Sequence, residues 1–74
     1  MRPATLNQNL ARNLRRLRIE RGLSQEDFAL RSGLHRTYIG GIERAERNIT
    51  LASIEKLAAA LDVHPLELLK DPVE

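Results

Sequence analysis

The sequence contains no cysteine and no tryptophan, and it has one phenylalanine and one tyrosine among its 74 residues. Without cysteine, neither a disulfide nor a zinc–thiolate site can hold the fold together. With so few aromatic rings, the core has to be built from aliphatic side chains. A core of this size is only marginally stable by itself, so we expect helix packing and oligomerisation to supply the stability.

Long apolar runs and targeting signals are lacking as well. No apolar run approaches the roughly 20 residues that span a membrane, and residues 1–10 contain no hydrophobic segment of a signal peptide. We therefore expect a cytoplasmic protein without membrane contact. The sequence has no Gly-x-Ser-x-Gly, no His-Glu-x-x-His and no phosphate-binding loop. We expect no enzymatic activity, no metal or other cofactor, and no small-molecule ligand.

The charge is unevenly distributed along the chain. The formal net charge is +2, but residues 1–47 hold ten arginines and five acids, whereas residues 48–74 hold two lysines and five acids. The acidic part would be repelled by phosphate and should face away from nucleic acid, while the basic part should face it. Some arginines of the basic part could either follow phosphates or simply solvate the surface: Arg12, Arg15 and Arg16.

Apolar periodicity predicts an all-α fold, with one compact five-helix domain over residues 1–74. Residues 1–5 should form a loose tail. The first helix carries its leucines on one stripe, at Leu6, Leu10, Leu14 and Leu17. The predicted helices cover residues 6–21, 25–32, 36–44 and 51–61, and a short fifth helix begins at residue 65.

Residues with known capping preferences mark the ends of these helices. Ser24, with Asp27 three positions later, resembles a capping box, and Thr50 is a natural N-cap for the fourth helix. Gly22 should end the first helix because glycine accepts the left-handed conformation. Pro65 should be the first residue of the fifth helix, where its missing N–H does no harm.

The stretch from Gln25 to Arg44 predicts two short helices joined by a tight turn at Gly33. Ile39 and Ile42 are three positions apart, so they lie on one face of the second of these helices. The residues left facing outward are cationic, hydroxyl-bearing, aromatic or very small: Arg36, Thr37, Tyr38, Gly40, Gly41 and Arg44.

This spacing resembles the helix-turn-helix of the Cro and phage-repressor family, and the resemblance extends from Leu10 to Leu69. Within that family, the run HRTYIGGIERAERNITL (residues 35–51) looks most like the controller proteins of restriction–modification systems. The resemblance implies a lambda repressor-like fold and a transcriptional regulator that binds double-stranded DNA. One departure is Gly40, where related controllers often carry serine, so this chain lacks a hydroxyl at that position.

The resemblance and the chemistry of the DNA grooves suggest a role for each polar residue. The third helix would enter the major groove, where Arg36 can donate two hydrogen bonds to guanine. Thr37 could contact a base edge, a thymine methyl group or a phosphate, and Tyr38 either reaches a phosphate or packs at the rim. Phosphate contacts that fix the register are expected from Gln25, Arg44, Arg47 and Asn48.

Two features of the third helix leave alternatives open. His35 falls at its N-cap, and it could be a cap, a phosphate contact or plain surface. Gly40 and Gly41 together cost roughly 2 kcal/mol of helix propensity, so we expect a close approach of the backbone to DNA or to the preceding helix. By resemblance to the family, Arg18 and Glu43 form a buried structural pair between the first and third helices.

A single third helix reads only a few base pairs, so we predict a symmetric homodimer on a near-palindromic operator. Three leucines within one turn of the fifth helix cannot all face their own core. The alternative is that this turn only wraps back over the first helix. The residues expected at the dimer interface are Ile49, Val63, Leu66 and Leu69.

The other function considered is an antitoxin-like protein-interaction module that also regulates its own promoter. Such a module should carry a more apolar outer face on the third helix than this sequence has.

Overall fold

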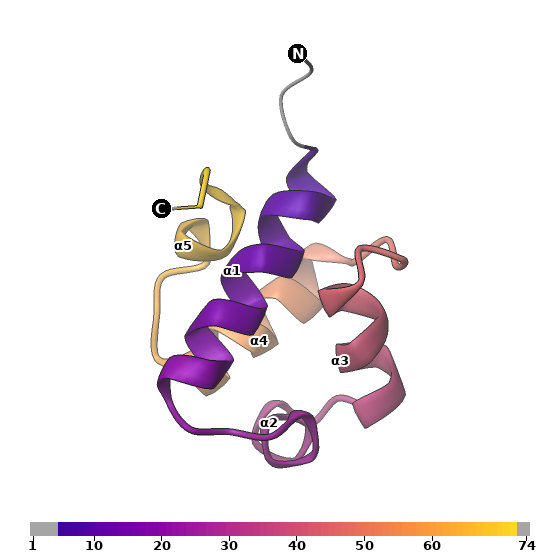
Figure 1. Cartoon of the computed structure of the whole chain (residues 1–74), viewed down its shortest axis with the longest axis vertical. Coiled ribbons are helices and arrows are strands. Elements are labelled where there is room, and N and C mark those ends of the chain that lie inside the picture. The colour runs from indigo at the N-terminus through magenta and orange to yellow at the C-terminus, as the bar shows by residue number, and fades with distance from the viewer. Residues whose placement is uncertain (1–4, 73–74) are drawn as a thin grey trace.

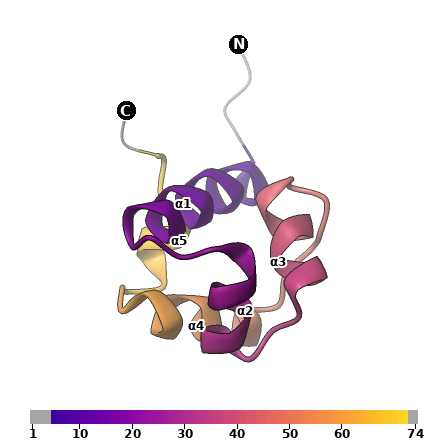
Figure 2. The same ribbon diagram turned by 60° about the horizontal axis from the view of Figure 1, so that its bottom comes forward.

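The computed structural model describes residues 5–72, and these residues form an all-α bundle. Figure 1 shows α1 running between α3 on one side and α5 on the other, with α4 crossing behind, and Figure 2 shows the same separation of α3 from α5. None of the helices in residues 5–72 combines the length and the apolar character needed to cross a membrane. The helices are α1 (Leu6–Glu20), α2 (Gln25–Ser32), α3 (Arg36–Glu43), α4 (Leu51–Leu61) and α5 (Leu66–Leu69).

The predicted caps are confirmed at α2 and α4. Ser24 and Asp27 form a reciprocal capping box at the start of α2, and the hydroxyl of Thr50 accepts the N–H of Ser53 at 3.1 Å. Gly33 ends α2 in the left-handed conformation, at φ 72°. The hydrogen bonds from Ser24 hold the pKa of the Asp27 carboxyl below its usual value.

The sequence prediction was wrong at the start of α1. Thr5 belongs not to a loose tail but to a cap: its hydroxyl accepts the N–H of Gln8 at 3.1 Å, and the Gln8 side chain accepts the N–H of Thr5 at 2.9 Å. The pattern Thr-x-x-Gln is itself a capping-box signature. The rest of the predicted tail, residues 1–4, lies outside the described residues.

Three predicted helix ends also shift by one residue. Arg21 and Arg44 are C-caps rather than the last helical residues of α1 and α3. Pro65 occupies the N-cap position of α5 instead of its first helical position. Nδ1 of His64 accepts the N–H of Leu66 at 3.1 Å, so the free N–H at the start of this short helix is already satisfied by the residue before the proline.

One aliphatic core lies between the helices, with Phe28 as its only aromatic residue among those that are fully buried. Leu10, Leu14 and Leu17 of the α1 stripe are buried as predicted, but Leu6 is 64% exposed. The helical period places Leu6 on the same face, yet the first turn of α1 extends past the helices that cover the rest of the stripe (Figure 1).

Two buried asparagines of α1, which the sequence analysis did not identify, fasten the C-terminal segment. Nδ2 of Asn13 donates to the carbonyl oxygens of Leu68 and Lys70 at 3.0 and 2.8 Å. Nδ2 of Asn9 donates to the carbonyl oxygen of Leu69 at 3.2 Å. The C-terminal turn therefore does pack along α1, while its leucines separate: Leu68 is fully buried, and Leu66 is 66% exposed.

Candidate nucleic-acid interface

The connection between α2 and α3 holds these two helices in a fixed relation. The N–H of Gly33 donates to the carbonyl oxygen of Ala29 at 3.0 Å, and the hydroxyl of Ser32 accepts the N–H of Leu34 at 3.3 Å. On the inner face of α3, Ile39 and Ile42 are buried in the core, as predicted. Because these two side chains fix the rotation of α3, its opposite face is presented outward.

A polar network joins α1, α2 and α3 behind that outer face. Nε and Nη2 of Arg18 donate to the two carboxylate oxygens of Glu43 at 2.6 and 3.0 Å, and Nη1 donates to the carbonyl oxygen of Leu23 at 2.7 Å. The side chains of Arg18 and Glu43 are 12% and 5% exposed. The hydrogen bond to Glu43 raises the pKa of Arg18 above its usual value. The structural pair expected from the family resemblance is present.

Gln25 takes part in the same network. Its Nε2 donates to a carboxylate oxygen of Glu43 at 3.3 Å, so this side chain bridges the start of α2 and the end of α3. Gln25 lies at the first position of α2, where the helix dipole and the free N–H groups favour an anion. A phosphate contact from Gln25 stays a prediction.

The outer side of α3 and the loop that follows it are polar and basic. Apart from Gln25, all the predicted DNA contacts lie here, and their side chains are exposed except that Tyr38 is half-buried and Gly40 is buried. The exposed ones are His35, Arg36, Thr37, Arg44, Arg47 and Asn48. Arg36, Gly40 and Arg44 follow one another at intervals of four, so they lie along one line of the helix surface.

Each of the adjacent glycines of α3 is covered by an arginine side chain. A Cβ atom at Gly40 would lie 3.0 Å from Nη1 of Arg44 and 3.5 Å from Oε1 of Gln25. A Cβ atom at Gly41 would lie 2.8 Å from Cγ of Arg47. The expected close approach to α2 is found at Gly40, where the side chain of Gln25 comes near. At Gly41 the neighbour is Arg47 in the loop that follows α3, which was not predicted.

Both arginines have further partners within the chain. The guanidinium carbon of Arg47 lies 5.8 Å from the centroid of the Tyr38 ring, within the range of a cation–π contact. Nε of Arg44 donates to a carboxylate oxygen of Glu46 at 2.8 Å, and both of these side chains are more than half exposed. Both carboxylates between residues 35 and 48, Glu43 and Glu46, are therefore already paired with arginine.

His35 acts as the N-cap of α3, one of the alternatives left open by the sequence. Its Nδ1 accepts the N–H of Thr37 at 3.1 Å. An accepting Nδ1 places the proton of the neutral ring on Nε2, which remains a donor at the exposed edge.

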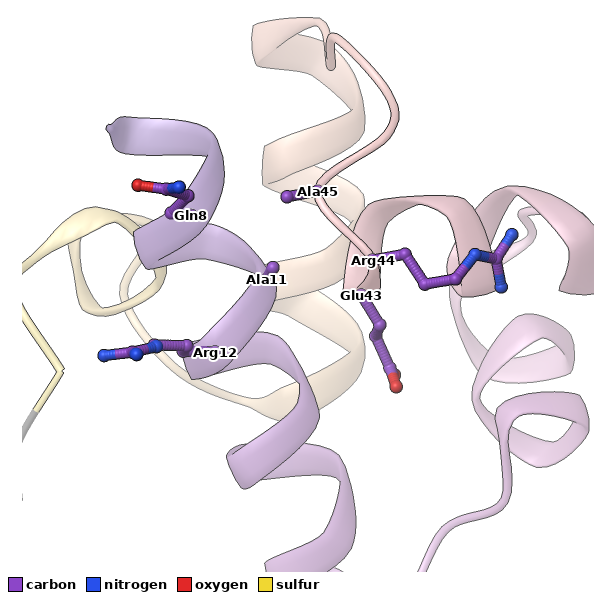
Figure 3. A pocket seen from close by; sticks show the side chains of 6 residues that line it. All are labelled: Gln8, Ala11, Arg12, Glu43, Arg44 and Ala45. Carbon is purple, nitrogen blue, oxygen red and sulfur yellow. The ribbon is translucent and has the colours of Figure 1, made fainter. Parts of the chain in front are cut away.

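A shallow hollow of about 300 Å³ lies between α1 and the end of α3, and Figure 3 shows the residues that line it. Arg12 and Arg44 contribute to its walls, but their side chains point in opposite directions, and Arg44 extends along α3 (Figure 3). The hollow therefore does not gather charged groups around one point. Within residues 5–72, no group of three or more His, Asp or Glu side chains is arranged to hold a metal ion.

The residues predicted at a dimer interface lie on a different part of the surface. An apolar hollow of about 210 Å³ is lined by Ile49 and Leu69 together with Leu51 and with Leu6, which was predicted only as part of the α1 stripe. Leu51 is 77% exposed. Val63 is half-buried, and neither it nor Leu66 belongs to the lining.

Comparison with known proteins agrees with this geometry. A family model described as helix-turn-helix matches residues 14–68. Over 65 residues the chain is 49% identical to a hypothetical transcription factor of Neisseria meningitidis serogroup B, and the match covers 88% of this chain and 61% of that protein. The chain thus spans less than two thirds of that relative's length.

Two solved structures are similar in both fold and sequence. The restriction–modification controller protein C.AhdI from Aeromonas hydrophila has a TM-score of 0.81 and 52% identity, covering 84% of this chain and 94% of that one. The controller protein C.Esp1396I, solved as a tetramer in complex with its natural 35 base-pair operator, has a TM-score of 0.79 and 37% identity, covering 92% of this chain and 100% of that one.

The resemblance read from residues 35–51 is confirmed by these matches, and so is the five-helix fold. This chain belongs to the helix-turn-helix family, and restriction–modification controller proteins are among its relatives.

Proposed function

We propose that this chain regulates transcription by binding a specific sequence of double-stranded DNA with the outer face of α3. The observation that carries the proposal is the exposed row of donors on α3 and its following loop, where the only two carboxylates are held by Arg18 and Arg44. Paired carboxylates repel phosphate less than free ones, so the face keeps a positive character. The role requires no catalysis and no cofactor.

In this proposal, the residues that contact base edges lie in the first turn of α3. Arg36 and Thr37 are exposed there, at the end that the helix-turn-helix geometry directs into the major groove. Arg36 would bind the O6 and N7 atoms of a guanine. Phosphate contacts would come from the flanks, from Gln25, Arg44, Arg47 and Asn48, with Nε2 of His35 as a further donor.

We further propose that the working unit is a homodimer on a near-palindromic operator within a restriction–modification operon, acting in the cytoplasm. Support comes from the apolar surface: Leu6, Leu51 and Leu66 are each more than 60% exposed, and two of them border the apolar hollow. A second copy of the chain is the occupant that would also place two α3 helices about 34 Å apart, one helical turn of DNA. The controller C.Esp1396I was solved as a tetramer on its operator.

The protein-interaction alternative would use an apolar outer face on α3. In this chain that face is polar and basic, which favours DNA as the partner.

Base reading is tested by Arg36→Ala, with Arg47→Ala as the matched arginine variant. On DNA from upstream of the chain's own gene, Arg36→Ala should cost about 1–3 kcal/mol and relax the preference at one base pair. Arg47→Ala should weaken binding to all sequences alike and reduce the salt dependence. Quantitative mobility shifts on the upstream DNA and on random DNA measure both. Equal losses on the two DNAs for Arg36→Ala would contradict its assignment as a base reader.

Dimer formation is tested by Leu66→Asp in sedimentation at micromolar concentration. We expect the wild type to sediment as a dimer and the variant as a monomer, because a carboxylate buried in an apolar interface is strongly disfavoured. The control is Leu30→Asp, since Leu30 is 82% exposed on α2, away from α5. A wild-type monomer that binds a non-palindromic site would end the dimer proposal.

A further inference from the structure

The two adjacent glycines of α3 are unusual for an eight-residue helix, because glycine is among the residues least favourable to a helix interior. Both are buried, although they belong to the side of α3 that carries the arginines. The side chains that cover the two glycines therefore indicate why glycine occurs at these positions. At each glycine the atoms nearest to an added Cβ belong to an arginine that follows later in the chain.

The contact at Gly41 is the tighter of the two. An ideal Cβ would come within 2.8 Å of Cγ, 3.1 Å of Nε and 3.5 Å of Cδ of Arg47. Three consecutive atoms near the root of the side chain pass over the glycine, so rotation of the terminal guanidinium alone cannot relieve the overlap. At Gly40 the nearest atom is Nη1 of Arg44, at 3.0 Å, and this flexible end can swing aside.

Tyr38 is the second neighbour of the Arg47 side chain. Tyr38 and Gly41 are three residues apart, so they are neighbours on the helix surface. The half-buried ring packs against the core, and the Arg47 guanidinium lies 5.8 Å from its centroid. The Arg47 side chain thus passes over the backbone of Gly41 and brings its guanidinium beside the Tyr38 ring.

We propose that Gly41 is a positioning residue: it leaves the space in which Arg47 lies across α3 against Tyr38, so that the guanidinium is in place before DNA arrives. The inference rests on the proposed function, because Arg47 is there a phosphate contact. An arginine side chain that is already ordered loses less conformational entropy when it binds a phosphate. Gly40 also leaves room for Arg44, but only the flexible end of that side chain lies near it.

The matched test compares Gly41→Ala with Gly40→Ala, the same substitution at adjacent positions of one helix. Alanine favours a helix interior over glycine, but at Gly41 the overlap with Cγ of Arg47 offsets part of this gain. Far-UV circular dichroism therefore first checks that both variants remain folded and helical. Nuclear Overhauser contacts between Arg47 side-chain protons and the Tyr38 ring report the positioning without DNA. The chain has a single tyrosine, so its ring signals are unambiguous.

We expect these contacts in the wild type and in Gly40→Ala, and their loss in Gly41→Ala. Contacts that survive in Gly41→Ala would overturn the proposal. Binding to random duplex DNA at several salt concentrations then links positioning to function. In a plot of the logarithm of the binding constant against the logarithm of the salt concentration, the magnitude of the slope should be about 0.9 smaller for Arg47→Ala, because one phosphate contact is lost. Gly41→Ala should lower the slope by the same amount, because it removes the same contact indirectly.

The double variant Gly41→Ala/Arg47→Ala distinguishes two reasons why DNA binding could depend on Gly41. A slope equal to that of Arg47→Ala alone supports positioning through Arg47. A further loss of affinity would mean that the Gly41 backbone itself approaches DNA, which would overturn the proposal. If Arg47→Ala leaves the slope unchanged, the assigned phosphate contact fails, while the Tyr38 contacts still decide whether Gly41 positions Arg47.

Discussion

Replacing Arg18 by alanine should destabilise this chain more than any surface change, because it leaves Glu43 buried without its cation. The Glu43 side chain is 5% exposed, and without Arg18 its carboxylate keeps only the 3.3 Å hydrogen bond from Gln25. Removing one partner of a buried pair costs roughly 3–5 kcal/mol. The carbonyl oxygen of Leu23 also loses the donor that lies 2.7 Å away.

That cost is large relative to the total free energy of unfolding of the domain. A domain of 74 residues has a total stability of about 4–11 kcal/mol. A loss of 3 kcal/mol would lower the melting temperature by about 12 °C or more, at about 4–8 °C per kcal/mol for a domain of this size. We therefore expect Arg18→Ala to be partly unfolded near physiological temperature and to bind DNA weakly for that reason.

The matched control is Arg16→Ala, on the same helix. Arg16 pairs with Glu20 at 3.3 Å, but these side chains are 34% and 55% exposed, so removing the pair should cost less than about 1 kcal/mol. Thermal and denaturant unfolding, followed by circular dichroism, measure both variants. Similar melting temperatures for Arg18→Ala and Arg16→Ala would refute the reasoning from burial. Lost DNA binding at an unchanged melting temperature would make Arg18 a contact residue.

Two further predictions concern the C-terminal segment and the cap of α2. Asn13→Ala removes the donor to the carbonyl oxygens of Leu68 and Lys70, and urea unfolding should show a loss of about 1–3 kcal/mol. The loss should be smaller for Asn7→Ala, because the half-buried Asn7 donates only a hydrogen bond of 3.2 Å to the exposed Asn48 side chain. Because the folded state lowers the pKa of Asp27, its charge stabilises the fold above the unfolded pKa of about 3.9, and this contribution is lost as the pH falls through the folded pKa. Asp27→Asn should therefore melt below the wild type at neutral pH and together with it in strong acid; a difference that persists in acid would contradict the electrostatic explanation.

The sequence determined the elements and their local ends because those depend on neighbouring residues. Ser24 with Asp27, Gly33 and Thr50 act through atoms no more than four residues away, so their roles could be read from spacing alone. The inward face of α3 followed from the three-residue spacing of Ile39 and Ile42 in the same way. The polar outer face of α3 was predicted as the remainder of that pattern.

Tertiary structure decided which parts of each pattern are covered and by what. The helical period places Leu6 on the stripe of Leu10 and Leu14, but only packing determines that the stripe is uncovered at its first turn. Likewise, no local signal shows that Asn13 donates to backbone 55 residues later. The covering of Gly41 by Arg47 has the same origin, because a side chain's direction across a loop depends on where the loop returns, and periodicity carries no information about that return.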